Sequence, residues 1–265
     1  MNGLALCAGI GGIELGLKRV LGERYRTVCY VEREAFCAAT LVERMEKQDL
    51  DKAPLWDDIR TFDAKPWRGV VDIISGGYPC QPFSTAGNRA GPDDPRHLWP
   101  DIRRILKETG APWLFCENVP GHLSMGFNSV LSELESDGFR VAADVFSAWE
   151  VGAGHRRERL FILAHRNGSG LNVERYGRLH QHPSQGKAFR NNAHRQSGTA
   201  MGKFPPGPID HQEWEKVDPR LKPSLCRVAH GIPNRVDRVR ALGNTVVPEV
   251  SAMAFVELSQ RILSC

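Results

Sequence analysis

The sequence predicts an α/β fold with a doubly wound, mostly parallel sheet and a small, irregular region inserted before the C-terminus. Three observations predict this fold. Short apolar runs alternate with amphipathic stretches up to residue 166, as in parallel sheets flanked by helices. Glycine or acidic residues follow several of these runs, as at ligand-binding strand ends. With 41% hydrophobic and 25% charged residues, the 265-residue chain has an ordinary globular composition.

The predicted elements follow one another in a regular order. Strands are expected at Leu4–Cys7, Thr27–Val31, Val70–Ser75, Trp113–Cys116, Val141–Phe146 and Arg159–Ala164. Helices are expected between most of them, at Glu34–Lys47, His97–Thr109 and Asn128–Ser136. A last helix, Pro248–Ile262, carries apolar residues at helical spacing, and its proline suits a first turn. We expect this helix to pack back on the first domain.

Composition excludes several classes of protein. No stretch approaches the roughly 18 consecutive apolar residues of a membrane helix, and the N-terminus lacks the pattern of a secretory signal. We therefore expect a cytoplasmic protein without membrane contact. The seven cysteines are odd in number and form no CxxC pair, which argues against a disulfide framework and a structural zinc site. We expect no metal.

A change of composition separates residues 166–235 from the rest of the chain. This segment holds 12 Lys and Arg against 5 Asp and Glu, a net charge of +7, together with 8 Gly and 7 Pro. The remaining chain has a net charge of −3. Basic charge gathered on one segment indicates a polyanion partner such as nucleic acid, or a solvated linker. The sequence thus divides into one domain, 1–165 with 236–265, and a basic region, 166–235.

The first strand ends in a glycine-rich turn, Ala8–Gly12, that leads into a helix. Glycines allow a tight turn and a close approach of the backbone to a ligand at the helix N-terminus. The next strand ends in Glu32, where a carboxylate can bind both hydroxyls of a ribose. Because the spacing departs from GxGxxG, S-adenosylmethionine fits this pattern at least as well as a dinucleotide. A plain βα turn and a helix cap are the alternatives.

The third strand leads into the segment SGGYPCQPFS, residues 75–84, in which Cys80 stands between two prolines. Proline fixes φ, so the loop is expected to present the Cys80 thiol at the carboxyl end of the sheet, where ligands of α/β proteins bind. A free thiol has a pKa near ~8.5, so a nucleophilic role needs a helix dipole or positive charge nearby. A buried structural cysteine is the alternative.

Two further strands carry charged residues at their ends. Glu117 follows a strand and is expected beside the Cys80 loop if the two strands are neighbours, where it can act as an acid or base. Arg157 and Arg159 precede the last strand, and alternation sends both to the same side, where they can bind phosphate or a base carbonyl. Solvated charges are the alternative for both. Residues 238–248, RVRALGNTVVP, predict a tight Gly-Asn turn before the last helix.

Taken in this order, the motifs resemble those of the DNA cytosine-5 methyltransferase family. The resemblance rests on PCQPFS (79–84), ENV (117–119) and ALGNTVVP (241–248), and it covers about residues 3–166 and 236–263. It implies an S-adenosylmethionine-dependent methyltransferase with a Rossmann-like fold, in which the basic region serves as the target-recognition region. The short length of that region is similar to that of bacterial or phage-type enzymes.

The resemblance implies a role for each motif. Cys80 would be the nucleophile, Glu117 would bind and protonate a flipped cytosine, Arg159 would hold the base carbonyl, and Arg157 would support the loop or a phosphate. Glu32 would bind the ribose and Asp58 would lie near the adenine amino group. The residues expected around S-adenosylmethionine, and around its product S-adenosylhomocysteine, are Ala8, Gly9, Ile10, Gly11, Gly12, Glu32, Asp58, Ile59, Pro79, Leu98, Asn244, Thr245 and Val246.

The resemblance also implies partners. We expect a monomer that methylates a specific site in double-stranded DNA, in the cytoplasm of a bacterial cell or encoded by a phage, with a restriction endonuclease as its functional partner. Two alternatives stay open: the tRNA-methylating branch of the family, and a non-catalytic nucleic-acid-binding module, against which the presence of both Cys80 and Glu117 argues. The chain departs from the family's pattern at Ala5, where many members have Asp, and at Gly154–His155, where Pro-Gln is usual.

Overall fold

The computed structural model describes residues 1–79, 98–166 and 235–264, so Cys80 and nearly all of the basic region lie outside the described residues. The described residues form a seven-stranded sheet in the order β3-β2-β1-β4-β5-β7-β6. All strands are parallel except β7, which runs antiparallel to both of its neighbours. The strands are β1 (Asn2–Leu6), β2 (Arg26–Val31), β3 (Leu55–Trp56), β4 (Ile73–Gly77), β5 (Trp113–Asn118), β6 (Phe139–Ser147) and β7 (Glu158–Arg166).

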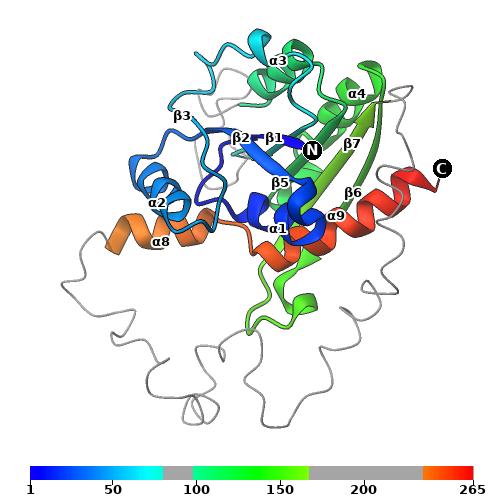
Figure 1. The fold of residues 1–265 in the computed structure, drawn as a ribbon. Helices are drawn as coiled ribbons and strands as arrows, with labels where there is room; N and C mark the ends of the chain where they lie inside the picture. The colour runs from blue at the N-terminus through cyan, green and yellow to red at the C-terminus, as the bar shows by residue number, and fades with distance from the viewer. Residues whose placement is uncertain (80–97, 167–234, 265) are drawn as a thin grey trace.

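Helices cover both faces of this sheet (Figure 1). They are α1 (Gly12–Leu21), α2 (Ala35–Glu46), α3 (Trp99–Thr109), α4 (Phe127–Ser136), α8 (Arg235–Asn244) and α9 (Pro248–Leu263). Short 3-10 helices lie at η1 (Gly22–Arg24), η2 (Lys65–Trp67), η4 (Pro120–Ser124) and η5 (Ala148–Val151). The predicted α/β fold with a mostly parallel, doubly wound sheet is therefore confirmed. No helix within the described ranges has the length and apolar content that a membrane span requires.

The inner strand β5 shows how the sequence produces two cores. Its side chains alternate between faces, and all six of its residues are buried. Trp113 and Phe115 pack in the core with α1 and α9, whereas Leu114 and Cys116 pack in the core with α3 and α4. Such continuous burial is typical of a strand covered by helices on both faces.

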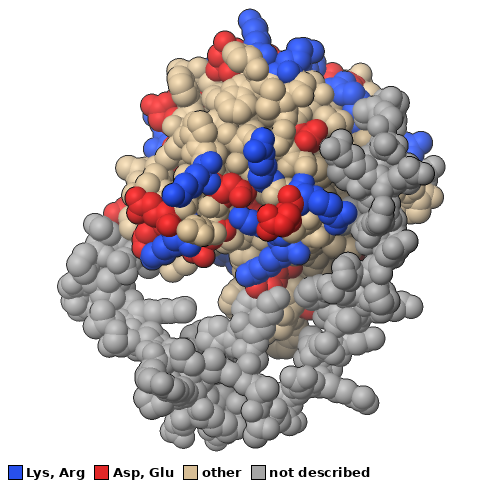
Figure 2. Space-filling model, viewed as in Figure 1, with Lys and Arg blue, Asp and Glu red and all other residues tan. Residues whose placement is uncertain are grey.

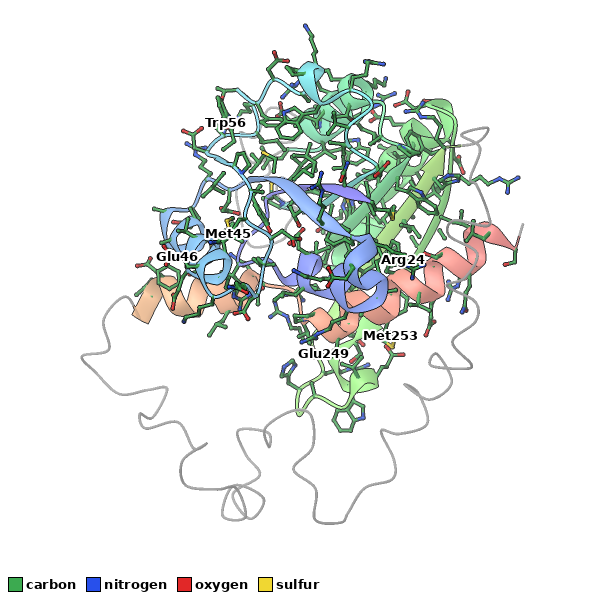
Figure 3. The ribbon with its side chains drawn as sticks, in the orientation of Figure 1. Arg24, Met45, Glu46, Trp56, Glu249 and Met253 are labelled. Carbon is green, nitrogen blue, oxygen red and sulfur yellow. The ribbon has the colours of Figure 1, made fainter. Side chains whose placement is uncertain are left out.

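The C-terminal helix α9 packs against α1, as the sequence predicted (Figure 1). Glycines permit this close approach, because a Cβ at Gly16 would lie 2.6 Å from the Cβ of Ser251. A Cβ at Gly12 would lie 2.4 Å from the carbonyl oxygen of Val246. Met253 of α9 is buried in the same core, and Met45 of α2 is buried further along the sheet (Figure 3). The segment before α9 is thereby held against the glycine turn.

The structure moves one strand start by three residues and adds two elements that the sequence did not predict. Strand β4 begins at Ile73 and not at Val70, because the amides of Val70 and of the next residue donate to the carbonyl of Trp67 and form a turn. The two-residue strand β3 is too short to give a periodic signal. Helix α8 occupies a stretch for which only a turn was predicted, and it lies beside α2.

A buried carboxyl group lies between α1 and the sheet. Glu14 is 1% exposed, and its Oε1 accepts a hydrogen bond of 2.7 Å from the hydroxyl of Ser75 on β4. Its Oε2 has no hydrogen-bond partner within the described part of the chain. Burial is the largest cause that raises the pKa of Glu14 to about 7. Between about pH 4.5 and pH 7 the folded protein therefore holds a proton that the unfolded chain has lost, so ionisation of Glu14 lowers stability as the pH rises.

We expect Glu14→Gln to stabilise the protein at alkaline pH. The amide keeps the acceptor for Ser75 but never ionises, so the gain in unfolding free energy over wild type should be about 2 kcal/mol larger at pH 8 than at pH 5. Chemical denaturation at both pH values measures this difference. The same substitution at the exposed position Glu23, Glu23→Gln, is the control for the change of charge. A Glu14→Gln effect that is equal at both pH values would contradict the raised pKa.

Candidate active site at the carboxyl edge of the sheet

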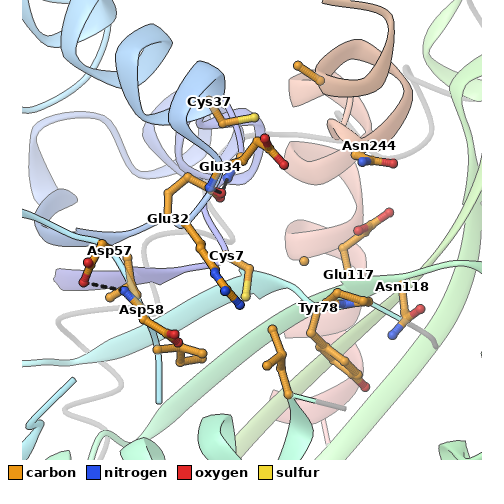
Figure 4. Close-up of a pocket in the computed structure, with 18 of the residues that line it drawn as sticks. Cys7, Glu32, Glu34, Cys37, Asp57, Asp58, Tyr78, Glu117, Asn118 and Asn244 are labelled. Carbon is orange, nitrogen blue, oxygen red and sulfur yellow. Dashed lines mark hydrogen bonds between the residues drawn. The ribbon is translucent and has the colours of Figure 1, made fainter. Parts of the chain in front are cut away.

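A cavity of about 1010 Å³ opens at the carboxyl ends of β1, β2, β4 and β5 (Figure 4). Nine residues that the sequence singled out line it: Gly9, Glu32, Asp58, Ile59, Pro79, Leu98, Glu117, Arg159 and Asn244. They come from widely separated parts of the chain and meet because parallel strands end at one edge of the sheet. Cavities of this volume hold ligands of the size of a nucleoside cofactor.

Glu32 lies at one end of this cavity (Figure 4). Its Oε2 accepts a 2.7 Å hydrogen bond from the amide of Gly9, and its Oε1 accepts a 2.7 Å bond from the amide of Glu34 before α2. Burial raises the pKa of Glu32, while these amide bonds oppose the rise. The carboxylate therefore supports the glycine turn and the start of α2, and it also lines the cavity.

The glycine turn adopts the backbone that its sequence predicted. Gly9 and Gly11 have φ angles of 57° and 83°, in the left-handed region that favours glycine. Only Gly9 of the segment Ala8–Gly12 lines the cavity. Ala8 packs near Leu41 of α2, and Ile10 is buried beside Ala241 of α8. Ala8, Ile10, Gly11 and Gly12 therefore do not line the cavity.

Four further residues that the sequence singled out line the cavity: Asp58, Ile59, Pro79 and Leu98. Asp58 accepts a 3.0 Å hydrogen bond from the amide of Arg60, and Ile59 is buried beside it. Leu98 precedes α3 and Pro79 follows β4, and both contribute to the lining. The sequence predicted these four positions only through the family resemblance.

Glu117 and Arg159 form an ion pair at the other end of the cavity. Nε of Arg159 lies 2.7 Å from Oε1 of Glu117, and the Glu117 side chain is 8% exposed. Burial is the main cause that raises the pKa of Glu117 to about 7, while the positive charges of Arg159 and Arg157 oppose the rise. A carboxyl group with this pKa can give up or accept a proton near neutral pH.

The strand pairing sets the position of Glu117 relative to the segment that leads to Cys80. Strands β4 and β5 are neighbours, and Gly77 pairs with Glu117. A Cβ on Gly77 would lie 2.9 Å from Oε2 of Glu117, so any larger residue at position 77 would displace this carboxylate from its observed place. Tyr78 and Pro79 continue from this point, and Cys80 itself lies outside the described residues. The neighbouring strands that the sequence analysis required are present.

Arg157 holds the turn before α9. Its Nη2 donates to the carbonyl oxygens of Gly243 at 2.6 Å and Thr245 at 2.5 Å. Arg159 Nη2 lies 3.5 Å from the same Gly243 oxygen, so the two arginines share one side, as alternation predicted. Arg157 thus ties β7 to the segment that carries Asn244 into the cavity. Thr245 and Val246 lie behind the cavity, against Gly12.

Several features of the cavity had no signal in the sequence. Cys7 lines it with a φ angle of 48°, and burial raises its pKa to about 12, so its thiol stays neutral. The buried Asn118 beside Glu117 has an amide Nδ2 with no hydrogen-bond partner among the described residues. Also in the lining, and missed by the sequence analysis, are Val31, Arg33, Glu34, Cys37, Asp57, Arg60, Gly77, Tyr78, Val119, Asp237 and Ala241.

The departures from the family's pattern have local explanations. Ala5 is buried in β1 next to Tyr30, where an apolar side chain packs in the core. Gly154–His155 lies in the turn that connects η5 to β7. Neither position lines the cavity. Within residues 1–79, 98–166 and 235–264, no group of three or more His, Cys, Asp or Glu side chains could hold a metal ion. The absence of a metal stays a prediction.

Comparison with curated proteins finds bacterial methyltransferases. The chain is 33% identical over 168 residues to the Type II methyltransferase M.NgoMIV of Neisseria gonorrhoeae, a match covering 62% of this chain and 51% of that protein. It is 34% identical over 163 residues to the Type II methyltransferase M1.ScrFI of Lactococcus lactis, covering 60% and 40%. The chain therefore spans about half the length, or less, of these relatives.

Solved structures share the fold. The S. pombe Dnmt2 methyltransferase superposes with a TM-score of 0.61 over 98% of this chain and 99% of its own, at 15% identity. A Spodoptera frugiperda DNMT2 structure gives 0.53 over 64% and 51%, at 23% identity. The family model for C-5 cytosine-specific DNA methylases matches residues 1–218, most of the chain. This chain belongs to the C-5 cytosine-specific DNA methylase family.

Proposed function

We propose that this protein is an S-adenosylmethionine-dependent DNA (cytosine-5-)-methyltransferase that acts on a flipped cytosine in a specific duplex site. The observation that carries this proposal is the buried Glu117–Arg159 ion pair, in one cavity with Glu32 and beside the segment that leads to Cys80. Membership of the family and the names of the bacterial relatives support it.

The described residues fit S-adenosylmethionine. Nothing lies within 4 Å of the place where a Cβ of Gly9 would stand, so the turn leaves its backbone open to a ligand. Glu32 would bind the ribose hydroxyls, Ile59 and Leu98 would contact the adenine, and Asp58 would accept from its amino group. When bound, S-adenosylmethionine supplies an electrophilic methyl group. The segment before α9 would close the far wall through Asn244.

Cys80, Glu117 and Arg159 would each act on a different atom of the cytosine base. The Cys80 thiolate adds to carbon 6 while Glu117 gives a proton to ring nitrogen 3, which makes carbon 5 nucleophilic. Because burial raises the pKa of Glu117 to about 7, this carboxyl group can carry that proton near neutral pH. Arg159, already bonded to Glu117, would hold the base carbonyl. Once carbon 5 has taken the methyl group, loss of its proton to a base expels the Cys80 thiolate, and nitrogen 3 returns its proton to Glu117 as the ring is restored.

DNA would be bound mainly by the basic region. Lys and Arg interleave with Asp and Glu on the face of the described residues in Figure 2, without one large positive patch there. The net charge of the chain outside residues 166–235 is −3, against +7 inside this region. A flipped base costs a few kcal/mol of lost stacking and pairing, which contacts to phosphates and bases must offset. We therefore assign target recognition to residues 166–235.

We expect this assignment to be visible in the salt dependence of DNA binding. Each neutralised phosphate contributes a slope of about −0.9 to the log–log dependence of affinity on salt. Replacing four basic residues of the region, such as Arg190, Arg195, Lys203 and Lys216, by Gln should weaken DNA binding and flatten this slope, yet leave cofactor affinity unchanged. Fluorescence anisotropy at several salt concentrations measures both effects. An unchanged slope would place the phosphate contacts elsewhere.

We expect Glu32→Gln to weaken the binding of S-adenosylmethionine by roughly 1–3 kcal/mol, because a charged acceptor is lost. The neutral amide keeps the size of the side chain, and isothermal titration calorimetry measures the affinity. Glu46→Gln, at an exposed position of α2, is the control (Figure 3). A loss of thermal stability with unchanged cofactor affinity would mean that Glu32 only supports the glycine turn and the start of α2.

A direct assay tests the proposed function and its two alternatives. Transfer of a tritiated methyl group to DNA and to tRNA, measured in parallel, separates the DNA enzyme from the tRNA branch. Transfer to neither would leave a non-catalytic binding module. Bisulfite sequencing of DNA from cells that express the protein would identify the target site. We further infer a cytoplasmic monomer with a restriction endonuclease as functional partner, which the relatives' designation as Type II methyltransferases supports.

A further inference from the structure

A buried aromatic cluster lies next to the reacting end of the cavity, outside the roles assigned above. Tyr78 follows β4 directly, and its ring packs against Trp99 at the start of α3, with centroids 5.8 Å apart. His122 of η4 stands edge-on to Tyr78 at 5.6 Å and contacts Phe127 at the start of α4 at 6.3 Å. Tyr78, Trp99 and His122 are each 5% exposed or less.

A hydrogen bond joins Tyr78 to His122 within this cluster. The Tyr78 hydroxyl lies 3.0 Å from Nε2 of His122, and both groups are buried. Burial lowers the pKa of His122, so the ring is neutral at physiological pH and Nε2 can accept from the hydroxyl. A buried hydrogen bond of this kind favours one arrangement of the two segments that carry it, because breaking it in the interior costs free energy.

The pair joins the two chain segments that flank the proposed chemistry. Tyr78 is one residue beyond Gly77, which pairs with Glu117, and two residues before Cys80. His122 lies five residues beyond Glu117, in a 3-10 helix whose first turn is closed by a bond from its amide to the Val119 carbonyl. The pairing of β4 with β5 ends at Gly77 and Glu117. Beyond this pair, the side-chain bond between Tyr78 and His122 links the two segments again.

We propose that Tyr78 and His122 are positioning residues, whose hydrogen bond holds the segment entering Cys80 at a fixed place relative to Glu117. This proposal rests on the proposed function. The nucleophile and the acid must reach opposite atoms of one ring, carbon 6 and nitrogen 3, at the same time. A displacement of about 1 Å between such groups can cost about 100-fold in rate. At the cofactor end, the Glu32 carboxylate is held by the amides of Gly9 and Glu34 and not by this pair.

The test is a set of substitutions that keep the ring packing. Tyr78→Phe and His122→Phe each remove one partner, and the double variant Tyr78→Phe/His122→Phe replaces both by apolar rings, which preserves folding. We expect each variant to lower the single-turnover rate of methyl transfer by about tenfold to about 100-fold, with the cofactor dissociation constant within about twofold of wild type. The double variant should be no slower than the slower single variant, since all three lack the same bond.

Two further variants separate positioning from general loss of structure. His122→Gln keeps an acceptor near the place of Nε2 and should retain more activity than His122→Phe. Tyr25→Phe removes another buried tyrosine hydroxyl, bonded at 3.2 Å to Thr27 at the opposite edge of the sheet, and should keep the wild-type rate. Full activity of Tyr78→Phe, or an equal loss in Tyr25→Phe, would overturn the proposal.

Amide hydrogen exchange provides a readout that needs no nucleic-acid substrate. Tyr78→Phe should accelerate exchange at His122 and Met125, whose amides close the turns of η4, and leave the β2 amides unchanged. Unchanged exchange in η4 would overturn the positioning role even if the rate falls. Wild-type protein that transfers methyl groups to no DNA would overturn the proposed function, whereas the exchange result still decides whether the bond orders η4.

Discussion

Replacing Cys80 by Ser is expected to abolish methyl transfer, with a loss of roughly 10³-fold or more, while S-adenosylmethionine still binds. Serine has no accessible oxyanion at neutral pH, so addition to carbon 6 and activation of carbon 5 are lost together. DNA with 5-fluorocytosine at the target should trap the wild-type protein covalently, because fluorine cannot leave as a proton does. A tritiated-methyl assay and denaturing electrophoresis of the adduct measure the two effects.

The other cysteines supply the control for this result. Burial raises the pKa of Cys7 to about 12 and that of Cys29 to about 11, and it raises the pKa of Cys116 further, so none of these three thiols is a thiolate at neutral pH. Cys29→Ser, at a buried position of β2 away from the cavity lining, should keep transfer and trapping. Wild-type protein that turns over the fluorinated DNA without an adduct would remove Cys80 from the mechanism.

Replacing Glu117 by Gln is expected to lower the rate of methyl transfer by about 10²-fold to 10⁴-fold, the usual contribution of a general acid. The amide preserves the size of the side chain beside Gly77, and its oxygen can still accept from Arg159. It cannot give a proton to ring nitrogen 3. Single-turnover measurements with saturating DNA and cofactor isolate this step from binding.

The pH dependence gives Glu117 a second, independent signature. A group that must be protonated, with a pKa of about 7, makes the rate fall as the pH rises through that value. The fall should disappear in Glu117→Gln. Glu108→Gln is the matched control, because Glu108 also pairs with an arginine, Arg104 at 3.1 Å, but does not line the cavity. A Glu117→Gln rate within twofold of wild type would mean that another group protonates the base.

Much of this protein could be predicted from the order of its residues. The alternation of apolar runs and amphipathic stretches predicted the sheet and the helices that cover it. Side chains repeat every two residues in a strand and every 3.6 residues in a helix, so a short stretch of sequence distinguishes the two. Gly9 and Gly11 predicted the tight turn before α1, because glycine readily adopts the positive φ angles that both residues have there. The placement of Glu32 and Glu117 at strand ends followed from the same periodicity, since the carboxyl ends of parallel strands meet at one edge.

The tertiary structure decided what those residues do to one another. Only the pairing of Gly77 with Glu117 brings the acid beside the Cys80 segment, and only packing in the interior raises the pKa values of Glu14 and Glu117. The hydrogen bonds from Arg157 to the carbonyl oxygens of Gly243 and Thr245 join residues more than 80 positions apart. Sequence patterns indicate local backbone preference. Burial, and contacts between residues far apart in the chain, depend instead on how the elements pack. That packing determines the pKa values and the hydrogen bonds at this edge of the sheet.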